Sequence, residues 1–212
     1  MATQTKKKKG DKKLAGVKFV TPRFRLSFPH CFEPHKATDD APPKYSITML
    51  VPKDSEEFKT LKGKLREAAA EAFGADPKKW PKISWPWRDG DEQEQYAGYA
   101  GHYAISADTN DPPGVVNRDR EDIVNPRDLY AGGFARAEVT AKAIVGVGVD
   151  DDKKPKNWVK FYLQHVWFLG GGEKFGPGGN AKDAFADIDE DFEVDDSHNE
   201  QDDEDYDDMS LS

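Results

Sequence analysis

Cationic side chains alternate with apolar ones in three stretches of the chain, residues 23–28, 134–145 and 157–167. Successive side chains of a β-strand point to opposite faces, so each stretch predicts a strand with one apolar face and one cationic face. In the last two stretches, aromatic rings accompany the cations. Cations neutralise phosphates and flat rings stack on bases, so the pattern predicts a surface for single-stranded nucleic acid.

The predicted contacts are Arg, Lys, Trp and Tyr side chains on these faces and in the segments beside them. They are Arg23, Arg25, Trp85, Trp87, Tyr99, Tyr103, Arg118, Arg136, Lys142, Trp158, Lys160 and Tyr162. Outward strand positions also collect Lys, Thr and aromatic residues because these side chains suit a sheet. A plain solvated sheet surface therefore stays an alternative interpretation of the strands.

Other chemistries find less support in the residue types. His30, Cys31 and His35 lie close in sequence, but HCxxxH is not a complete zinc pattern and no CxxC partner exists. No carboxylate pair stands with His or Lys in a catalytic order, and neither Cys31 nor Ser106 has a neighbouring activating base. We expect no metal, no other cofactor and no enzymatic activity.

The elements that position these side chains are predicted from hydrophobic periodicity. Strands are expected at residues 23–28, 45–51, 99–107, 134–145 and 157–167. The residues expected to face the core are Phe24, Leu26 and Phe28; Tyr45, Ile47, Met49 and Val51; Ala135, Ala137, Val139, Ala141, Ala143 and Val145; and Val159, Phe161, Leu163 and Trp167.

One helix is predicted between the second and third of these strands. Asp54 or Ser55 can cap it and Gly74 can end it. Its apolar residues recur at steps of three and four, so the helix can plug or brace the sheet. They are Phe58, Leu61, Leu65, Ala68, Ala69 and Ala72.

Residues 80–90 contain three tryptophans and two prolines, which exclude a regular helix. Large aromatic side chains in a loop pack into a core more often than they stay free. Packing and base stacking both stay open for Trp85 and Trp87.

Charge divides the chain into a basic body and an acidic end. Residues 183–212 hold 15 of the 40 acidic residues and none of the 31 Lys and Arg, so this stretch carries −15 and the remainder +6. A basic body attracts phosphates, while an acidic tail repels or imitates them. Charge alone leaves a purely solubilising tail as an alternative.

We predict four regions: a disordered basic arm at 1–16, a binding domain at 17–169, a Gly-rich hinge at 170–180 and a disordered acidic tail at 181–212. No run reaches the 18 apolar residues of a membrane span, and the lysine-rich start leads into no signal region. A single cysteine fits a reducing compartment, so a cytoplasmic location, without membrane contact, is expected.

An ordered set of segments resembles a phage family of single-stranded DNA-binding proteins, the phage T7 type. No single segment is specific to the family, but the ordered set of segments is. The likeness spans roughly residues 17–185. The segments are Arg88-Asp89-Gly90-Asp91, residues 96–106 with Gly98 and Gly101, Pro113-Gly114-Val115-Val116-Asn117, Leu129-Tyr130-Ala131-Gly132 and a final strand running into Gly170-Gly171-Gly172.

The resemblance implies an OB-fold, a mainly β architecture with a five-stranded barrel and an inserted helix. It implies a host-cytoplasmic protein that coats single-stranded DNA without strong sequence preference in phage DNA replication and recombination. It further implies a homodimer whose acidic tail competes with DNA and recruits replication proteins such as a polymerase, a helicase-primase or recombination factors. Tails of this family commonly end in Phe, whereas this chain ends Met209-Ser210-Leu211-Ser212, so the partner of the tail stays open.

Two other functions are retained for testing. A protein-interaction adaptor would use the acidic tail to bind basic partners, and its barrel would never meet nucleic acid. A metal-dependent nuclease would need an ordered cluster of acids, which the sequence lacks.

Overall fold

The computed structural model describes residues 15–146 and 156–175. This part of the chain is mainly β with one long helix, as predicted. The described residues fall within one compact unit, Met1–Gly179. None of the helices in the described ranges is long and apolar enough to span a bilayer.

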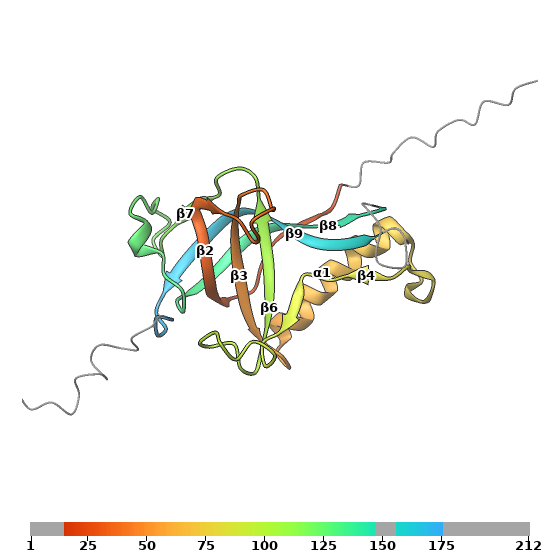
Figure 1. Cartoon of the computed structure of the whole chain (residues 1–212), viewed down its shortest axis with the longest axis horizontal. Coiled ribbons are helices and arrows are strands. Elements are labelled where there is room, and N and C mark those ends of the chain that lie inside the picture. Colours follow the sequence, from red (N-terminus) through yellow and green to blue (C-terminus); the bar gives the residue numbers. More distant parts are fainter. Residues whose placement is uncertain (1–14, 147–155, 176–212) are drawn as a thin grey trace, which may run out of the picture. The chain divides into compact units, whose positions relative to one another are not determined.

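Five strands close into a barrel (Figure 1). The circuit runs from β2 to β3, β6, β9 and β8, and back to β2 through the pairs of Phe24 with Ala135 and Arg25 with Phe134. Only the contact of β6 with β9 is parallel; the other four are antiparallel. The strands are β2 (Phe24–His35), β3 (Lys44–Pro52), β6 (His102–Thr109), β8 (Phe134–Ile144) and β9 (Asn157–Gly170).

Four short strands extend the sheet beyond the barrel, and two 3₁₀ turns lie in the connections. β1 forms an edge beside β8, while β4 and β7 pair with β9 and β5 pairs with β6. Their bounds are β1 (Val17–Val20), β4 (Ile83–Ser84), β5 (Trp87–Asp89) and β7 (Gly114–Val116), with turns at Pro77–Lys79 and Pro126–Asp128.

Alternation along the strands builds the core as expected from period two. In β3, Ile47, Met49 and Val51 are buried, whereas Ser46 and Thr48 lie on the outer side. In β8, the four alanines and Val139 are buried, so their small side chains let the opposite wall and the helix approach closely.

The predicted helix is α1 (Glu56–Phe73). Ser55 is its cap, since the Ser55 hydroxyl accepts a hydrogen bond from the Phe58 amide at 3.1 Å, and Gly74 ends the helix with a φ of 94°. Its buried face joins the barrel core and lies against β8 and β9 (Figure 1). The residues of that face are Phe58, Leu61, Leu65, Ala68 and Ala69.

The prediction that Trp167 faces the core is wrong. Glu138 pairs with His165 but Val139 pairs with Leu163, so Gln164 is an extra residue in β9. Such a bulge reverses which side the following residues occupy. Val166 and Phe168 therefore enter the core, and Trp167 lies on the outer face.

The predictions for Phe28 and Val145 are also wrong. The register of β2 shifts between Ser27 and His30, and Phe28 turns outward with 41% of its surface exposed. Cys31, not Phe28, enters the core. Val145 lies after the end of β8 and is 53% exposed.

Other boundaries differ from the expectation more modestly. The strand predicted at 99–107 is β6, which begins at His102, so Tyr99 precedes it. Residues 170–175, within the predicted hinge, fold back onto the barrel, since the Phe175 amide donates to the Ala131 carbonyl at 2.9 Å. The predicted arm, except residues 15 and 16, and the predicted tail lie outside the described residues, and the domain limits stay predictions.

Candidate nucleic-acid interface

The outer face of β8 and β9 brings four predicted contact residues together: Lys142, Trp158, Lys160 and Tyr162, here called the β9 patch. Lys142 pairs with Lys160 across the two strands. The Lys160 ammonium lies 4.4 Å from the centre of the Tyr162 ring and the Lys142 ammonium 5.9 Å from it. Trp158 is 43% exposed at the end of this row.

One carboxylate, Asp108 on β6, fixes the lysines of this surface. The Lys160 ammonium donates to both Asp108 oxygens, at 2.7 and 2.9 Å, and the Lys44 ammonium donates to one of them at 3.2 Å. Burial, and then the Asp108 charge, raise the pKa of Tyr162, so its ring stays a neutral phenol. Two ammonium groups thus share one carboxylate, and Lys142 adds a third cation beside the Tyr162 ring, so the surface keeps a net positive charge.

Short polar side chains line the barrel between the β9 patch and β2. In the strand register, Ser46 pairs with Asp108 and Thr48 with Ser106, while Asp108 pairs with Tyr162. Ser106 is exposed, and Ser46 and Thr48 are half-buried. We call Ser46, Thr48 and Ser106 the polar floor, because their short side chains project less from the sheet than the larger side chains on either side.

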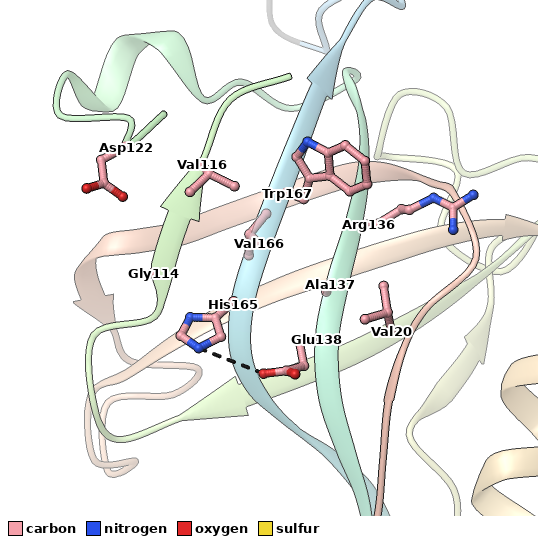
Figure 2. Close-up of a pocket in the computed structure, with 10 residues that line it drawn as sticks. All are labelled: Val20, Gly114, Val116, Asp122, Arg136, Ala137, Glu138, His165, Val166 and Trp167. Carbon is pink, nitrogen blue, oxygen red and sulfur yellow. Dashed lines mark ion pairs between the residues drawn. The ribbon is translucent and has the colours of Figure 1, made fainter. Parts of the chain in front are cut away.

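A second group lies farther along the same two strands. Arg136 pairs with Trp167, and the Arg120 guanidinium lies 5.5 Å from the centre of the Trp167 ring. A pocket of about 410 Å³ opens here, with Val116 and Val20 on opposite sides and Trp167 between them (Figure 2). Below it, His165 Nε2 lies 3.8 Å from Glu138 Oε2, an ion pair when the imidazole is protonated (Figure 2).

A tight turn presents Arg118 and Arg120. The Asn117 side-chain oxygen accepts from the amides of Asp119 and Glu121, at 2.9 and 3.0 Å, and Arg120 adopts a φ of 68°. Both arginines are exposed. The turn thus places Arg120, which was not predicted, over Trp167, whereas the predicted Arg118 lines a separate pocket with Ile123 and Phe168.

Arg23 and Arg25 lie at the junction of β2 and β8, away from the β9 patch in the strand register. The exposed Arg23 guanidinium lies 4.7 Å from the centre of the Phe134 ring. Arg25 is already engaged, since it donates to the carbonyls of Gly132 and Glu173 at 3.2 and 3.0 Å. Its role in the structure is to hold the segment around Glu173.

Four of the predicted contact residues are packed. Trp85 and Trp87 stack on each other at 5.0 Å and pack against the core beside Phe58. Tyr103 stacks on Phe58 at 4.2 Å, and Tyr99 is only 2% exposed. Burial raises the pKa of Tyr99, whose hydroxyl shares a hydrogen bond with Ser27. Tyr99 is thus buried and Trp85, Trp87 and Tyr103 are half-buried, so the structure gives these rings a packing role in the fold.

Sequence reasoning missed several exposed or half-buried rings. Phe28 was assigned to the core, His30 and His35 were weighed only as metal ligands, and Tyr96 was not singled out. The signal was Pro29, because a proline cannot donate within a central ladder and marks a bulge. The His30 and His35 rings stack at 4.3 Å, and no cluster of three metal-ligating side chains occurs in the described ranges.

Solved structures of two phage proteins share this fold. The single-stranded DNA-binding protein from bacteriophage Enc34, solved in complex with ssDNA, is 22% identical with a TM-score of 0.59, covering 78% of this chain and 99% of that chain. The single-stranded DNA-binding protein gp2.5 of bacteriophage T7 is 12% identical with a TM-score of 0.52, covering 85% of this chain and 99% of that chain.

Sequence comparison gives the family. Protein p50 of Acyrthosiphon pisum secondary endosymbiont phage 1 is 29% identical over an alignment of 176 residues that covers 78% of this chain and 90% of the relative. The family model described as Enterobacter phage Enc34, ssDNA-binding protein, matches residues 17–205 and thus every strand of the barrel. The resemblance predicted from sequence is confirmed. The chain belongs to the family of the Enterobacter phage Enc34 single-stranded DNA-binding protein.

Proposed function

We propose that this protein binds single-stranded DNA without strong sequence preference, along the outer surface of its barrel. The observation that carries the proposal is the β9 patch, where the exposed Trp158 and the half-buried Tyr162 flank Lys160 on one outward-facing row. Stacking tolerates any base, and lysines contact the phosphates that every nucleotide carries. The family membership of the chain supports the same function.

The barrel topology supports an OB-fold. A five-stranded closed circuit with one parallel contact, between β6 and β9, agrees with the Greek-key barrel of that fold. OB-folds bind oligonucleotides across their second and third strands, here β3 and β6. The polar floor occupies that position, directly beside the β9 patch.

The biological setting follows from the family. We infer a non-enzymatic protein that coats single-stranded DNA during phage replication and recombination in the host cytoplasm, and that acts as a homodimer. The acidic segment 181–212 recruits replication proteins and competes with DNA, because it carries the charge of a phosphate chain. The adaptor function without DNA binding is not favoured.

Titration with fluorescent oligothymidine tests the proposal. The wild-type chain should bind, and added salt should weaken binding. Lys142→Glu should reduce affinity, since it reverses a charge 5.9 Å from the Tyr162 ring. Lys59→Glu is a matched control with the same charge change on α1, and it should bind as wild type. Absence of oligothymidine binding by the wild type would favour the adaptor.

A further inference from the structure

A second group of rings lies on the outer face of the barrel, where β2 bulges. A pocket of about 550 Å³ opens there, between β2 and the loop before β6. We call it the aromatic pocket. Aromatic rings supply five of the ten residues that line it, namely Phe28, His30, Tyr96, Tyr99 and Phe175.

Phe28 adopts a strained backbone conformation at this pocket. Its φ is 44°, which bulky L-residues rarely adopt. The following residue, Pro29, restricts the backbone of Phe28 still further. Burial does not compensate the strain, because 41% of the Phe28 surface remains exposed. Strain of this kind concentrates at ligand-binding sites, where it holds a side chain in a required place.

The neighbouring rings are arranged for stacking. The Phe28 and His30 rings lie 6.3 Å apart and 18° from parallel, and the His30 and His35 rings lie 4.3 Å apart and 13° from parallel. Tyr96, which is 39% exposed, contacts Phe28 edge-to-face at 5.1 Å. Two exposed rings at right angles thus offer one face and one edge to a flat ligand.

Buried groups fix the base of the aromatic pocket. Tyr99 supports Phe28 from below, at 6.5 Å between ring centres, and its hydroxyl lies 3.2 Å from the Ser27 hydroxyl. Gly98 has a φ of 79° and lies directly against the Phe175 ring, where a larger residue would collide. The pocket is therefore preformed in the structure.

The aromatic pocket is continuous with the β9 patch. His30 pairs with Ser46, Ser46 with Asp108, and Asp108 with Tyr162. One row across the barrel thus leads from the pocket, over the polar floor, to Tyr162. A single-stranded DNA molecule lying along this row would meet aromatic rings at both ends of the row and short side chains between them.

We propose that the aromatic pocket takes an unstacked base of the same DNA strand that the β9 patch binds. This inference rests on the proposed function. A base can enter only when it is unpaired and unstacked, which duplex DNA does not offer, so the pocket favours single strands over duplexes. An aromatic side chain of a protein partner is the competing occupant.

Photocrosslinking of the full chain tests the site directly. Oligothymidine in which 5-iodouracil replaces thymine should crosslink to Phe28 or Tyr96 as well as to Trp158 or Tyr162, as read by mass spectrometry of peptides. Adducts on β9 residues alone would overturn the aromatic pocket as a base site and leave the proposed function standing. Absence of both adducts and binding would instead overturn the proposed function.

Substitutions give an independent readout. Phe28→Gly removes the ring and relieves the φ strain, so affinity for oligothymidine should fall about 5- to 150-fold while the melting temperature holds or rises. Phe28→Tyr should retain binding. Val124→Ala, at a side chain 84% exposed outside both sites, is the control and should bind as wild type.

A second variant protects the test against unfolding. Should Phe28→Gly melt early, Tyr96→Leu removes the other exposed ring without touching the strained residue. Its affinity should fall in the same range, and wild-type affinity in a folded Tyr96→Leu would overturn the proposal. Binding of a tyrosine-rich peptide that oligothymidine fails to displace would overturn it in favour of a protein partner.

Discussion

Tyr162 and Phe161 are neighbours in β9 with opposite environments. Phe161 is fully buried and contacts Phe19 edge-to-face at 5.7 Å, whereas Tyr162 lies on the outer face beneath Lys160. The same kind of ring therefore belongs to the core at one position and faces the outside of the barrel at the next.

Substitutions on the two faces should fail in different ways. Tyr162→Ala and Trp158→Ala should each weaken DNA binding by about 1 to 3 kcal/mol with little change in melting temperature. Phe161→Ala should lower the free energy of unfolding by about 3 to 5 kcal/mol, because it leaves a cavity. Oligonucleotide titration and thermal melting of the three variants check this. If Tyr162→Ala and Trp158→Ala melted early, the assignment of the inner and outer faces of β9 would be wrong.

Cys31 should be inert in the folded protein. Burial raises the pKa of its thiol to about 12, so almost no thiolate forms at pH 8. A maleimide should label Cys31 only after unfolding. The thiol of the unfolded chain ionises near pH 8.5. The buried thiol of Cys31 therefore contributes to the free energy of unfolding below that pH, and this contribution falls as the pH rises above it. Rapid labelling under native conditions would show that Cys31 is not buried.

At the scale of elements, one inserted residue decides what β9 presents. Without Gln164, the alternation would place Trp167 in the core and Val166 outside. With it, Trp167 stands opposite Arg136 and beneath Arg120. The bulge thus places Trp167 on the outer face of the barrel, where it lies beside Arg136 and Arg120.

The cap of α1 should affect stability and not DNA binding. Ser55→Ala removes the acceptor of the Phe58 amide and should lower the free energy of unfolding by about 1 kcal/mol. Ser55→Asp retains an acceptor and should restore stability. Denaturant titration measures both, and oligothymidine affinity should match the wild type. A loss of affinity in folded Ser55→Ala would assign α1 a role in binding.

At the scale of the whole molecule, we expect the division of charge to govern affinity for DNA. A segment of −15 tethered to a body of +6 has a high effective concentration for the cations of that body. We therefore propose that phosphates and the acidic segment compete for the same cations.

Removal of residues 181–212 should therefore strengthen DNA binding. The titration compares full-length and truncated chains with one oligonucleotide at one fixed salt concentration. An unchanged or weaker affinity of the truncated chain would contradict competition by the acidic segment.

The salt dependence of the truncated chain should report the phosphate contacts. The logarithm of affinity should fall with the logarithm of salt by about 0.7 for each neutralised phosphate. Arg136→Ala should reduce that slope by about 0.7 if Arg136 contacts a phosphate. An unchanged slope would place Arg136 outside the DNA path.

The sequence by itself determined the mainly β class, the helix with a cap at Asp54 or Ser55, the faces of β3 and β8, and the family. These features depend on local periodicity and capping, which neighbouring residues encode. The β9 patch was also predictable, because Trp158, Lys160 and Tyr162 share a face of any regular strand.

Only the tertiary structure decided the two bulges and the fate of the rings near them. Whether Phe28 and Trp167 face inward depends on the register of β2 against β3 and of β9 against β8, and one extra residue reverses it. Likewise, Trp87 and Tyr103 pack against Phe58 of α1, and Trp85 stacks on Trp87. No alternation within one strand encodes such a contact, since it arises only when distant elements meet.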